Sequence, residues 1–580
     1  MQQTPPQIPP ETPPRDTFTL TPPPIPAPAP PNSKEPADPA LFEEIKLDFP
    51  ITPGPCGPTW ESIKQNYPGE PAWWRDAKFG VFVHWGPQAS GMSGDWYARK
   101  LYMEGTEPYN NHLKNFGHPS EVGYKDVLNQ WKAAKWDPKD LTQKFHDAGM
   151  RFMMVVGVHH DNFDLWHSRY QPWNSLNIGP KRDMIGEWQR EAKKHDMRFG
   201  ITFHHEYTWW WWATAYEADK AGPKAGVPYD AHLTWADGAG LWWEGYDPRL
   251  LYTLDLREYR EVAFIPHTRK GIFQDHIDYG KWYATWWARR IQDAVEQYDP
   301  DFFYTDGNAA GPFCGVKSGS GLKADAGPRV VADFYNRAHK NHGKIDTIAF
   351  IKWVPGNPAI GITRENTFPN EIVSNVMWIG ENPIGDWYYA PGYHYDAIML
   401  VRSLLEYASR DGHYACAVPL TPQGDLEPAC IQMLSDMGAW MKINGDGIYG
   451  SRAWKVFGEG DLVTDPSKPD AAPKLRNMPQ GKLEARHAEF QYTTRDFRFT
   501  AGEDGAVYAW CMAIPKPGEA ITIKSLGTDA KLLDRKIESV TLLGSTAKLQ
   551  WRQEAAGLDV TMPNDLNGKY AVGVAVRISI

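Results

Sequence analysis

The feature that most limits the fold of this chain is an alternation of short apolar runs with longer amphipathic segments. The apolar runs are rich in Val, Ile and Phe, as expected of strands buried on both faces, and the segments between them have the 3.6-residue period of helices. Such alternation predicts a parallel α/β sheet or barrel. The expected strands are 78–85, 151–160, 198–207, 301–307 and 347–353, and the expected helices are 140–149, 184–196 and 279–298.

Polar side chains follow four of the expected strands at their carboxyl ends. His84 ends the first strand, His159 and His160 the second, His204 the third and Asp306 the fourth. A single His in such a place is more often structural, but three strands that end in this way favour a shared pocket. In a (β/α)8 barrel these strand ends converge on the face where active sites lie. We therefore predict a (β/α)8-like (TIM-type) barrel with a pocket lined by these residues.

Composition divides the chain into three parts. Residues 1–45 are Pro-rich and lack a periodic apolar pattern, so we expect an extended, disordered tail. Residues 46–465 contain the expected catalytic barrel. Residues 466–580 contain short β-patterned runs between turn residues, which predicts a C-terminal β-sandwich.

The Pro-rich leader also bears on localisation. Such leaders tether exported bacterial proteins to a surface, so we expect a periplasmic, surface-tethered or secreted protein whose signal peptide is absent from this sequence. A cytoplasmic protein with an unusual tail is the alternative.

Charge and aromatic content limit the partners. The net charge is −10 and no basic stripe is present, so we expect no nucleic-acid partner. No apolar run reaches the ~20 residues that a membrane span needs, so we expect none. The chain has 27 Trp, four of them consecutive at 209–212. Aromatic rings either line a cleft for a stacking ligand such as a sugar or pack in cores and domain seams, and both interpretations stay open.

Three chemistries fit the strand ends to different degrees. The His residues and Asp306 can coordinate a divalent ion, but no ligand-spaced motif such as HExxH is present. Ser or Cys hydrolysis lacks a GxSxG turn and a Cys at a strand end beside a His. Glycoside hydrolysis needs two carboxyl groups, and Asp306 is the first candidate, although an Asp before Gly is also a common turn residue. We expect no metal and no cofactor.

An ordered set of motifs makes the third chemistry specific. AKFGVFVHWGP, GDWYARKLY, VGVHHDNFDLWHS, WNSLNIGPKRDMIGEW, RFGITFHHEYTWWW and YDPDFFYTDG follow one another along the chain. Together they resemble glycoside hydrolase family 29, the α-L-fucosidases. The resemblance extends from about residue 60 to residue 580. It implies a barrel followed by a β-sandwich, and exo-acting hydrolysis of terminal α-L-fucosyl bonds with retention, through a covalent glycosyl-enzyme intermediate and without a metal.

The resemblance also implies roles for single residues. Asp306 matches the family's nucleophile. Asp95 stands where the family often has Glu, and Lys352 where it often has Arg, so both depart from the usual pattern. The residues expected to bind substrate are His84, Asp95, Trp96, His159, His160, His204, Lys352 and Trp387, the last as an apolar wall for the sugar methyl. Asp161 and Asn162 are expected to orient the histidines.

The acid/base is fixed less well by the sequence. Residues 361–387 contain several carboxyl groups, and we favour Glu365, then Glu381, then Glu371. The predicted function is a retaining α-L-fucosidase that acts on a fucosylated oligosaccharide or polysaccharide. The alternatives are an α-L-galactosidase, because a pocket built around a methyl group discriminates weakly against an added hydroxyl, and a non-catalytic sugar-binding barrel. Sequence does not specify linkage, aglycone, sulfation tolerance or oligomeric state.

Overall fold

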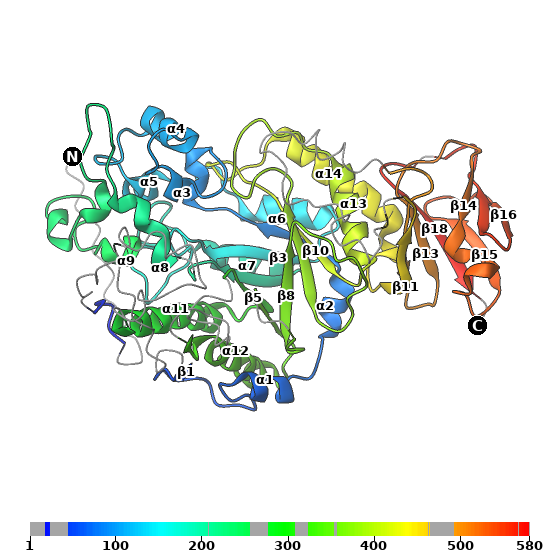
Figure 1. Ribbon diagram of the computed structural model, residues 1–580, viewed down its shortest axis with the longest axis horizontal. Helices are drawn as coiled ribbons and strands as arrows, with labels where there is room; N and C mark the ends of the chain where they lie inside the picture. Colours follow the sequence, from blue (N-terminus) through cyan, green and yellow to red (C-terminus); the bar gives the residue numbers. More distant parts are fainter. Residues whose placement is uncertain are drawn as a thin grey trace, which may run out of the picture.

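Eight parallel strands close into a barrel in the order β10-β2-β3-β4-β5-β7-β8-β9 (Figure 1). The computed structural model describes residues 18–23, 44–206, 208–253, 255, 277–307, 323–352, 356–461, 463, 492–566 and 568–578. The barrel strands are β2 (Phe79–Val83), β3 (Phe152–Val158), β4 (Arg198–Phe203), β5 (Phe302–Thr305), β7 (Ile348–Ile351), β8 (Ile360–Glu365), β9 (Trp378–Pro383) and β10 (His413–Ala417).

Helices cover the outside of the barrel. The predicted strands and helices are confirmed to within a few residues at their ends. Sequence analysis did not find β8, β9 and β10. The outer half of β8 is only half-buried and carries Thr363, Arg364 and Glu365, so it lacks the apolar run that marks the other strands. The main helices are α6 (Pro138–Asp147), α7 (Met184–Lys194), α11 (Ile277–Tyr298), α12 (Ala326–His342), α13 (Ala397–Ala408) and α14 (Pro428–Asn444).

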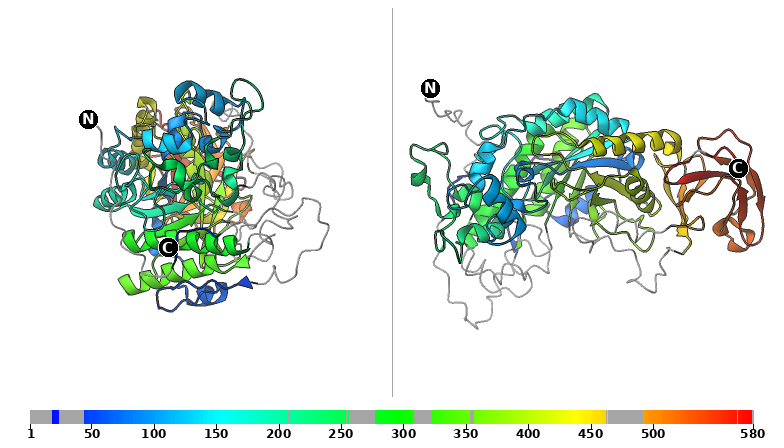
Figure 2. Two further views of the ribbon diagram at one scale, coloured as in Figure 1. Left: turned by 90° about the vertical axis from the view of Figure 1, so that its left-hand side faces the viewer. Right: turned by 90° about the horizontal axis from the view of Figure 1, so that it is seen from above.

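Two long connections lie over the carboxyl ends of the barrel strands. The connection after β2 contains a 3-10 turn and three short α-helices. The connection after β4 contains two short α-helices. In Figures 1 and 2 these elements lie at the end of the molecule opposite the C-terminal sheets. The short helices of this part are α3 (Tyr97–Lys100), α4 (Glu107–Asn115), α5 (Tyr124–Gln130), α8 (Thr208–Trp211) and α9 (Arg249–Tyr252), and α1 (Trp60–Asn66) and α2 (Ala72–Ala77) precede the barrel.

The C-terminal part contains two antiparallel sheets over a common apolar core, as predicted for a β-sandwich. One sheet has the order β11-β12-β13-β18-β15 and the other β14-β17-β16. Ile521 and Val560 of the smaller sheet share the core with Phe499 and Val574 of the larger one. The strands are β11 (Arg452–Glu459), β12 (Phe497–Ala501), β13 (Val507–Cys511), β14 (Ala520–Ile523), β15 (Ile537–Leu542), β16 (Gln550–Gln553), β17 (Leu558–Thr561) and β18 (Val572–Ile578).

The larger sheet begins earlier than the boundary expected between residues 465 and 466. β11 pairs with β12 and so belongs to the sheet, although it precedes that boundary. It follows α14 after only a 3-10 turn, Gly445–Gly447, so no composition change marks the transition. The expected boundary itself lies outside the described residues.

The barrel and the larger sheet are joined through buried polar contacts. Arg498 on β12 donates to both carboxylate oxygens of Glu406 on α13, from Nε at 2.9 Å and from Nη2 at 2.7 Å. Tyr492 Oη donates to the same carboxylate at 2.6 Å. Trp440 on α14 donates from Nε1 to the carbonyl of Ala571 at 3.0 Å. These contacts attach the two helices directly to the sheet.

A short part of the N-terminal segment, residues 18–23, lies on the barrel. Phe18 stacks on Trp282 of α11 with ring centroids 6.0 Å apart. Trp282 Nε1 donates to the carbonyl of Thr19 at 2.9 Å. The apolar residues Phe18 and Leu20 interrupt the Pro-rich composition and give this short segment a surface to bury. The tail at 1–17 and 24–43 lies outside the described residues.

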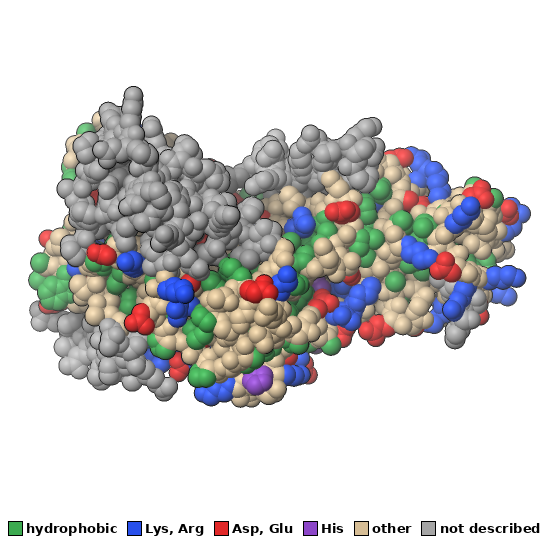
Figure 3. Space-filling view, turned by 60° about the horizontal axis from the view of Figure 1, so that its bottom comes forward, with side chains coloured by type: hydrophobic (Ala, Val, Ile, Leu, Met, Phe, Trp, Pro, Cys, Tyr) green, Lys and Arg blue, Asp and Glu red, His purple; other side chains and the backbone are tan. Residues whose placement is uncertain are grey.

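The surface carries charges of both signs. Basic and acidic side chains are interspersed over the C-terminal sheets on the face drawn in Figure 3. Among the described residues, no helix combines the length and the apolar character needed to cross a bilayer.

Candidate active site

Three charged side chains from neighbouring strands meet at the carboxyl end of the barrel. Asp306 follows β5, Lys352 follows β7, and Glu365 ends β8. Lys352 Nζ lies 2.8 Å from Asp306 Oδ1 and 2.8 Å from Glu365 Oε2. The two carboxylate oxygens can therefore be no farther apart than twice that distance. The side chain of Glu365 is 38% exposed and that of Asp306 is 14% exposed, so both border an accessible space.

The surroundings of Asp306 keep it ionised. Burial pushes the pKa of Asp306 upward, but the ammonium of Lys352 and then the imidazole of His204 outweigh it and hold that pKa well below its usual value. Gly307 lies against the carboxylate of Glu206, so a Cβ at this position would displace that side chain.

The histidines present fixed donors and acceptors to the space beside Asp306. His204 Nδ1 donates to Asp306 Oδ2 at 3.2 Å while Nε2 accepts from Thr202 Oγ1 at 3.0 Å. His160 Nδ1 donates to the carbonyl of His204 at 2.6 Å, and its Nε2 lies 3.5 Å from Asp306 Oδ2. Gln88 Nε2 donates to His159 Nδ1 at 2.7 Å, which leaves Nε2–H of His159 as a donor.

Three of these imidazoles have lowered pKa values and are therefore neutral at neutral pH. Burial, followed by the neighbouring histidines, lowers the pKa values of His84 and His159 well below the usual value. Burial also lowers the pKa of His160 to about 3, against the opposing charge of Asp306. Neutral rings can both donate and accept, which suits the hydroxyl groups of a sugar.

His84 stands between the histidines and an aromatic wall. Neither of its ring nitrogens has a hydrogen-bond partner among the described residues. Its ring lies 5.1 Å from that of Trp387 and 4.9 Å from that of Tyr388, centroid to centroid. A buried imidazole without a partner is costly unless a ligand satisfies it. His84 and Trp387 therefore lie where the sequence predicted, with an apolar surface beside a polar group that lacks a partner.

Asp95 and Trp96 reach the same pocket from the connection after β2. Ligand atoms of His84, Asp95 and His159 lie within 4.8 Å of one another. Burial and the nearby Asp386 raise the pKa of Asp95 well above its usual value. Trp96 has a φ of 64°, rare for a bulky residue, and its ring lies 5.9 Å from that of His160. Such backbone strain is often found at binding sites.

The other two acid/base candidates lie in different surroundings. Glu381 on β9 is only 1% exposed. Its Oε1 receives a hydrogen bond from Tyr304 Oη at 3.2 Å, and its Oε2 has no partner among the described residues. Burial raises the pKa of Glu381 to about 8, although Lys352 opposes the shift. Glu371 is exposed in the connection after β8.

Two expectations about neighbouring residues need correction. Asp161 accepts from Tyr124 Oη at 2.5 Å, and Asn162 donates to the carbonyls of Leu250 and Leu251. Their side chains thus anchor the loop to other connections, and the histidines are oriented by other groups. Trp211 and Trp212 are fully buried, which supports packing over a sugar subsite for this half of the tetratryptophan. The side chains of 209 and 210 lie outside the description.

Sequence reasoning missed the residues that hold the histidines. Gln88 and Thr202 fix His159 and His204, and Tyr388 packs on His84. Gln88 and Tyr388 lie within four residues of predicted site residues, and Thr202 lies two residues before His204 on the same face of β4. Proximity and strand periodicity were therefore the available signals.

The arrangement permits carboxylate chemistry more directly than metal binding. Ring nitrogens of His159, His160 and His204 lie within 4.8 Å of one another. However, both nitrogens of His204 and one nitrogen of each other ring already make hydrogen bonds within the protein. A metal with three imidazole ligands would have to break at least one of these bonds.

Comparisons with known proteins match both parts of the chain. A family model described as alpha-L-fucosidase matches residues 48–446, and one described as the alpha-L-fucosidase C-terminal domain matches residues 491–578. Tissue alpha-L-fucosidase of Rattus norvegicus is 22% identical over 568 residues, which cover 91% of this chain and 93% of the relative. The tissue alpha-L-fucosidase of Homo sapiens is 23% identical over 458 residues, covering 74% and 81%.

Solved structures share the fold. The Thermotoga maritima alpha-fucosidase in complex with fucose is similar with a TM-score of 0.61 and 19% identity, covering 90% of this chain and all of that one. A GH29 alpha-L-fucosidase from Bacteroides thetaiotaomicron has a TM-score of 0.57 and 16% identity, covering 92% and 99%.

Proposed function

The chain belongs to the alpha-L-fucosidase family, and on that basis we propose that it is an exo-acting, retaining α-L-fucosidase with Asp306 as nucleophile and Glu365 as acid/base. Membership in the family makes it a glycoside hydrolase. Asp306 attacks the anomeric carbon while Glu365 protonates the departing oxygen. Water, activated by the same Glu365, then hydrolyses the glycosyl-enzyme.

One observation carries this proposal, the contact of one ammonium with two carboxylates. Retaining glycosidases hold their two carboxyl groups ~5–5.5 Å apart, whereas inverting enzymes leave room for a water between them. Because Lys352 Nζ is 2.8 Å from an oxygen of Asp306 and of Glu365, those oxygens are at most twice that distance apart, which favours the retaining arrangement over the wider inverting one. Glu381 is only 1% exposed, which favours the more accessible Glu365 as the acid/base.

The lining of the pocket supports a deoxyhexose in the binding position. His159 offers a donor, and neither ring nitrogen of His84 has a hydrogen-bond partner among the described residues. The ring of Trp387 supplies an apolar surface for the methyl group of fucose. We propose a fucosylated oligosaccharide or polysaccharide as the substrate.

Two alternatives remain to be distinguished by experiment. An α-L-galactosidase would use the same carboxyl groups, because L-galactose adds only a hydroxyl at C6. A non-catalytic sugar-binding barrel would lack a functional pair, yet Asp306 and Glu365 both border the pocket. The pair therefore favours an enzyme.

The deciding experiment is hydrolysis of 4-nitrophenyl α-L-fucoside and 4-nitrophenyl α-L-galactoside by the wild-type protein, with and without EDTA. We expect turnover of the fucoside that is insensitive to EDTA, and ¹H NMR should show the α-anomer of fucose as the first product. Initial release of the β-anomer would exclude the retaining mechanism. Loss of turnover in EDTA would instead point to the histidine cluster as a metal site.

A further inference from the structure

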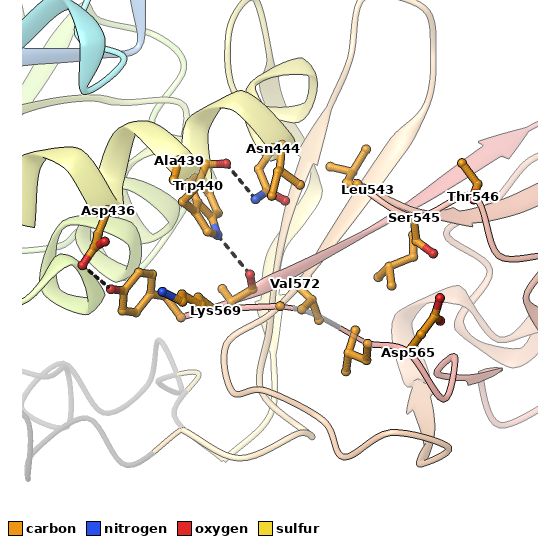
Figure 4. A pocket seen from close by; sticks show the side chains of 17 residues that line it. Asp436, Ala439, Trp440, Asn444, Leu543, Ser545, Thr546, Asp565, Lys569 and Val572 are labelled. Atoms are coloured by element: carbon orange, nitrogen blue, oxygen red, sulfur yellow. Dashed lines mark hydrogen bonds between the residues drawn. The ribbon is translucent and has the colours of Figure 1, made fainter.

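A cavity lies between the barrel and the larger C-terminal sheet. Its volume is about 370 Å³, within the range of pockets that bind small ligands. One wall is the face of α14 that carries Trp440 and Asn444, and the other consists of the turn 542–546 and the segment 565–572 (Figure 4). In Figures 1 and 2 this seam lies at the opposite end of the barrel from the connections that cover the active site. The cavity is thus separate from the catalytic pocket.

An amide oxygen at this cavity has no hydrogen-bond partner among the described residues. Asn444 is 4% exposed, and its Nδ2 donates to the carbonyl of Trp440 at 2.9 Å. Its Oδ1 accepts no hydrogen bond from any described residue, and Figure 4 shows it on the side turned toward Leu543. This oxygen can therefore accept a hydrogen bond from water or from a ligand in the cavity.

Charged groups at the rim are also unpaired. Lys569 and Asp565 line the cavity, and neither makes an ion pair or side-chain hydrogen bond with the described residues. Asp436, on the opposite wall, accepts from Tyr570 Oη at 3.3 Å and retains acceptor capacity. The lining therefore offers several acceptors and one cationic donor. Its charged groups are the two carboxylates of Asp436 and Asp565 and the ammonium of Lys569.

The remaining lining is apolar. Trp440, Leu542 and Val572 are buried and contribute hydrocarbon surface to the cavity. A purely apolar ligand would leave Asn444 unpaired, and an anion would meet an excess of carboxylates. A neutral sugar ring matches both features, since its hydroxyls donate to the acceptors and its C–H face packs on the apolar side chains.

We propose that this seam cavity is a second carbohydrate-binding site, which takes one neutral pyranose unit of a glycan. The site rests on the proposed function only in that both recognise a sugar. It would hold a glycan chain on the C-terminal part of the molecule while the barrel acts elsewhere on a chain end.

The test uses the full-length protein and two pairs of matched variants. Ala439 is exposed on α14 and lines the cavity, so Ala439→Trp fills its mouth, whereas Ser435→Trp places the same ring at an exposed position of α14 outside the cavity. Lys569→Ala removes the cationic donor, and Lys442→Ala removes an exposed lysine of α14 that does not line the cavity.

D-Galactose, N-acetyl-D-glucosamine and L-fucose are each titrated and followed by saturation-transfer NMR. We expect a saturable binding event for at least one of them that Ala439→Trp abolishes and Lys569→Ala weakens about tenfold. Both control variants should bind like the wild type. Hydrolysis of 4-nitrophenyl α-L-fucoside is measured on the same samples and should not change.

Two outcomes overturn the proposal. Either none of the three sugars binds with saturation, or the affinity in Ala439→Trp equals that in Ser435→Trp for every sugar that does bind. A wild-type protein that binds a sugar in this variant-sensitive way but hydrolyses no fucoside would retain the seam site and reject only the catalytic proposal.

Discussion

Lys352 Nζ lies 2.8 Å from Asp306 Oδ1, so the proposed nucleophile forms an ion pair with a residue of the neighbouring strand. The same ammonium contacts Glu365, which places one positive charge between the two carboxylates of the site. The chemistry of the pocket should therefore depend on Lys352 almost as much as on the carboxyl groups themselves.

Asp306→Ala should abolish turnover without unfolding the protein. Without the nucleophile no glycosyl-enzyme can form, and kcat/KM for 4-nitrophenyl α-L-fucoside should fall about 10³-fold or more. Asp301→Asn is a suitable control, because Asp301 precedes the same strand but pairs with Arg198 outside the pocket. Equal activity in the two variants would remove Asp306 from the mechanism, and circular dichroism checks that both are folded.

Lys352→Met should move the acid limb of the pH profile. The ammonium holds the pKa of Asp306 low, so its removal raises that pKa and the nucleophile becomes protonated at higher pH. The acid limb of kcat/KM should shift upward by about one pH unit or more, and activity at neutral pH should fall about 100-fold. Lys352→Arg keeps the charge and should keep the limb in place. An unmoved limb in Lys352→Met would show that another group controls it.

Glu365→Ala should separate activated from natural substrates. A 4-nitrophenolate group leaves with little protonation, whereas the sugar alcohol of 2′-fucosyllactose needs an acid. We expect the loss of kcat/KM to be about 10²-fold or more for the oligosaccharide and smaller for the aryl fucoside. Azide, which attacks the glycosyl-enzyme without a general base, should restore turnover of the aryl substrate and yield α-fucosyl azide. An identical loss on both substrates with no azide effect would argue against this role.

Sequence indicated the strand ends because barrel topology carries such ends to one face, whereas Asp95, Lys352 and Trp387 were expected only from the family resemblance. His159, His160 and Asp306 each follow a clear apolar run, so their positions could be predicted. The environment of each side chain could not be predicted in the same way. Glu365 and Glu381 both lie in the segment 361–387 and pair in register on β8 and β9. Glu381 is nevertheless buried, whereas Glu365 is accessible. That difference depends on three-dimensional packing, as does the stacking of Phe18 on Trp282.

Glu381→Gln should leave activity at and below neutral pH intact and alter the alkaline side. With a pKa raised by burial to about 8, Glu381 is a neutral acid at lower pH, and Gln has nearly the same shape without the proton. We expect kcat/KM within about threefold of wild type below pH ~7. As pH rises through 8, ionised Glu381 places a new negative charge near Lys352, so the wild type should lose activity that the variant retains. Glu371→Gln, at an exposed carboxyl, should follow the wild-type profile. A strong loss of kcat/KM in Glu381→Gln at neutral pH would mean that activity depends on the ionised form of Glu381.

Glu406→Gln should destabilise the protein far more than loss of a surface ion pair. The side chains of Glu406 and Arg498 are 3% and 1% exposed, and Arg410 also contacts the carboxylate. Removing the charge leaves two buried guanidinium groups without it, which costs about 3–5 kcal/mol in comparable sites. The control is Asp534→Asn, because Asp534 pairs with Lys455 at 2.7 Å on the surface and such pairs contribute about 0–1 kcal/mol.

The pH dependence of this pair has a defined sign. Burial opposes ionisation of Glu406, but Arg498 and Arg410 outweigh it and lower the pKa to about 2. In the unfolded chain a Glu titrates near ~4.3, so the pair stabilises the fold fully above that pH and progressively less as pH falls toward 2. Thermal unfolding of wild type and Glu406→Gln should therefore differ most at neutral pH and converge in acid. A difference in Tm that stays constant from neutral to acidic pH would show that Glu406 contributes through packing and not through its charge.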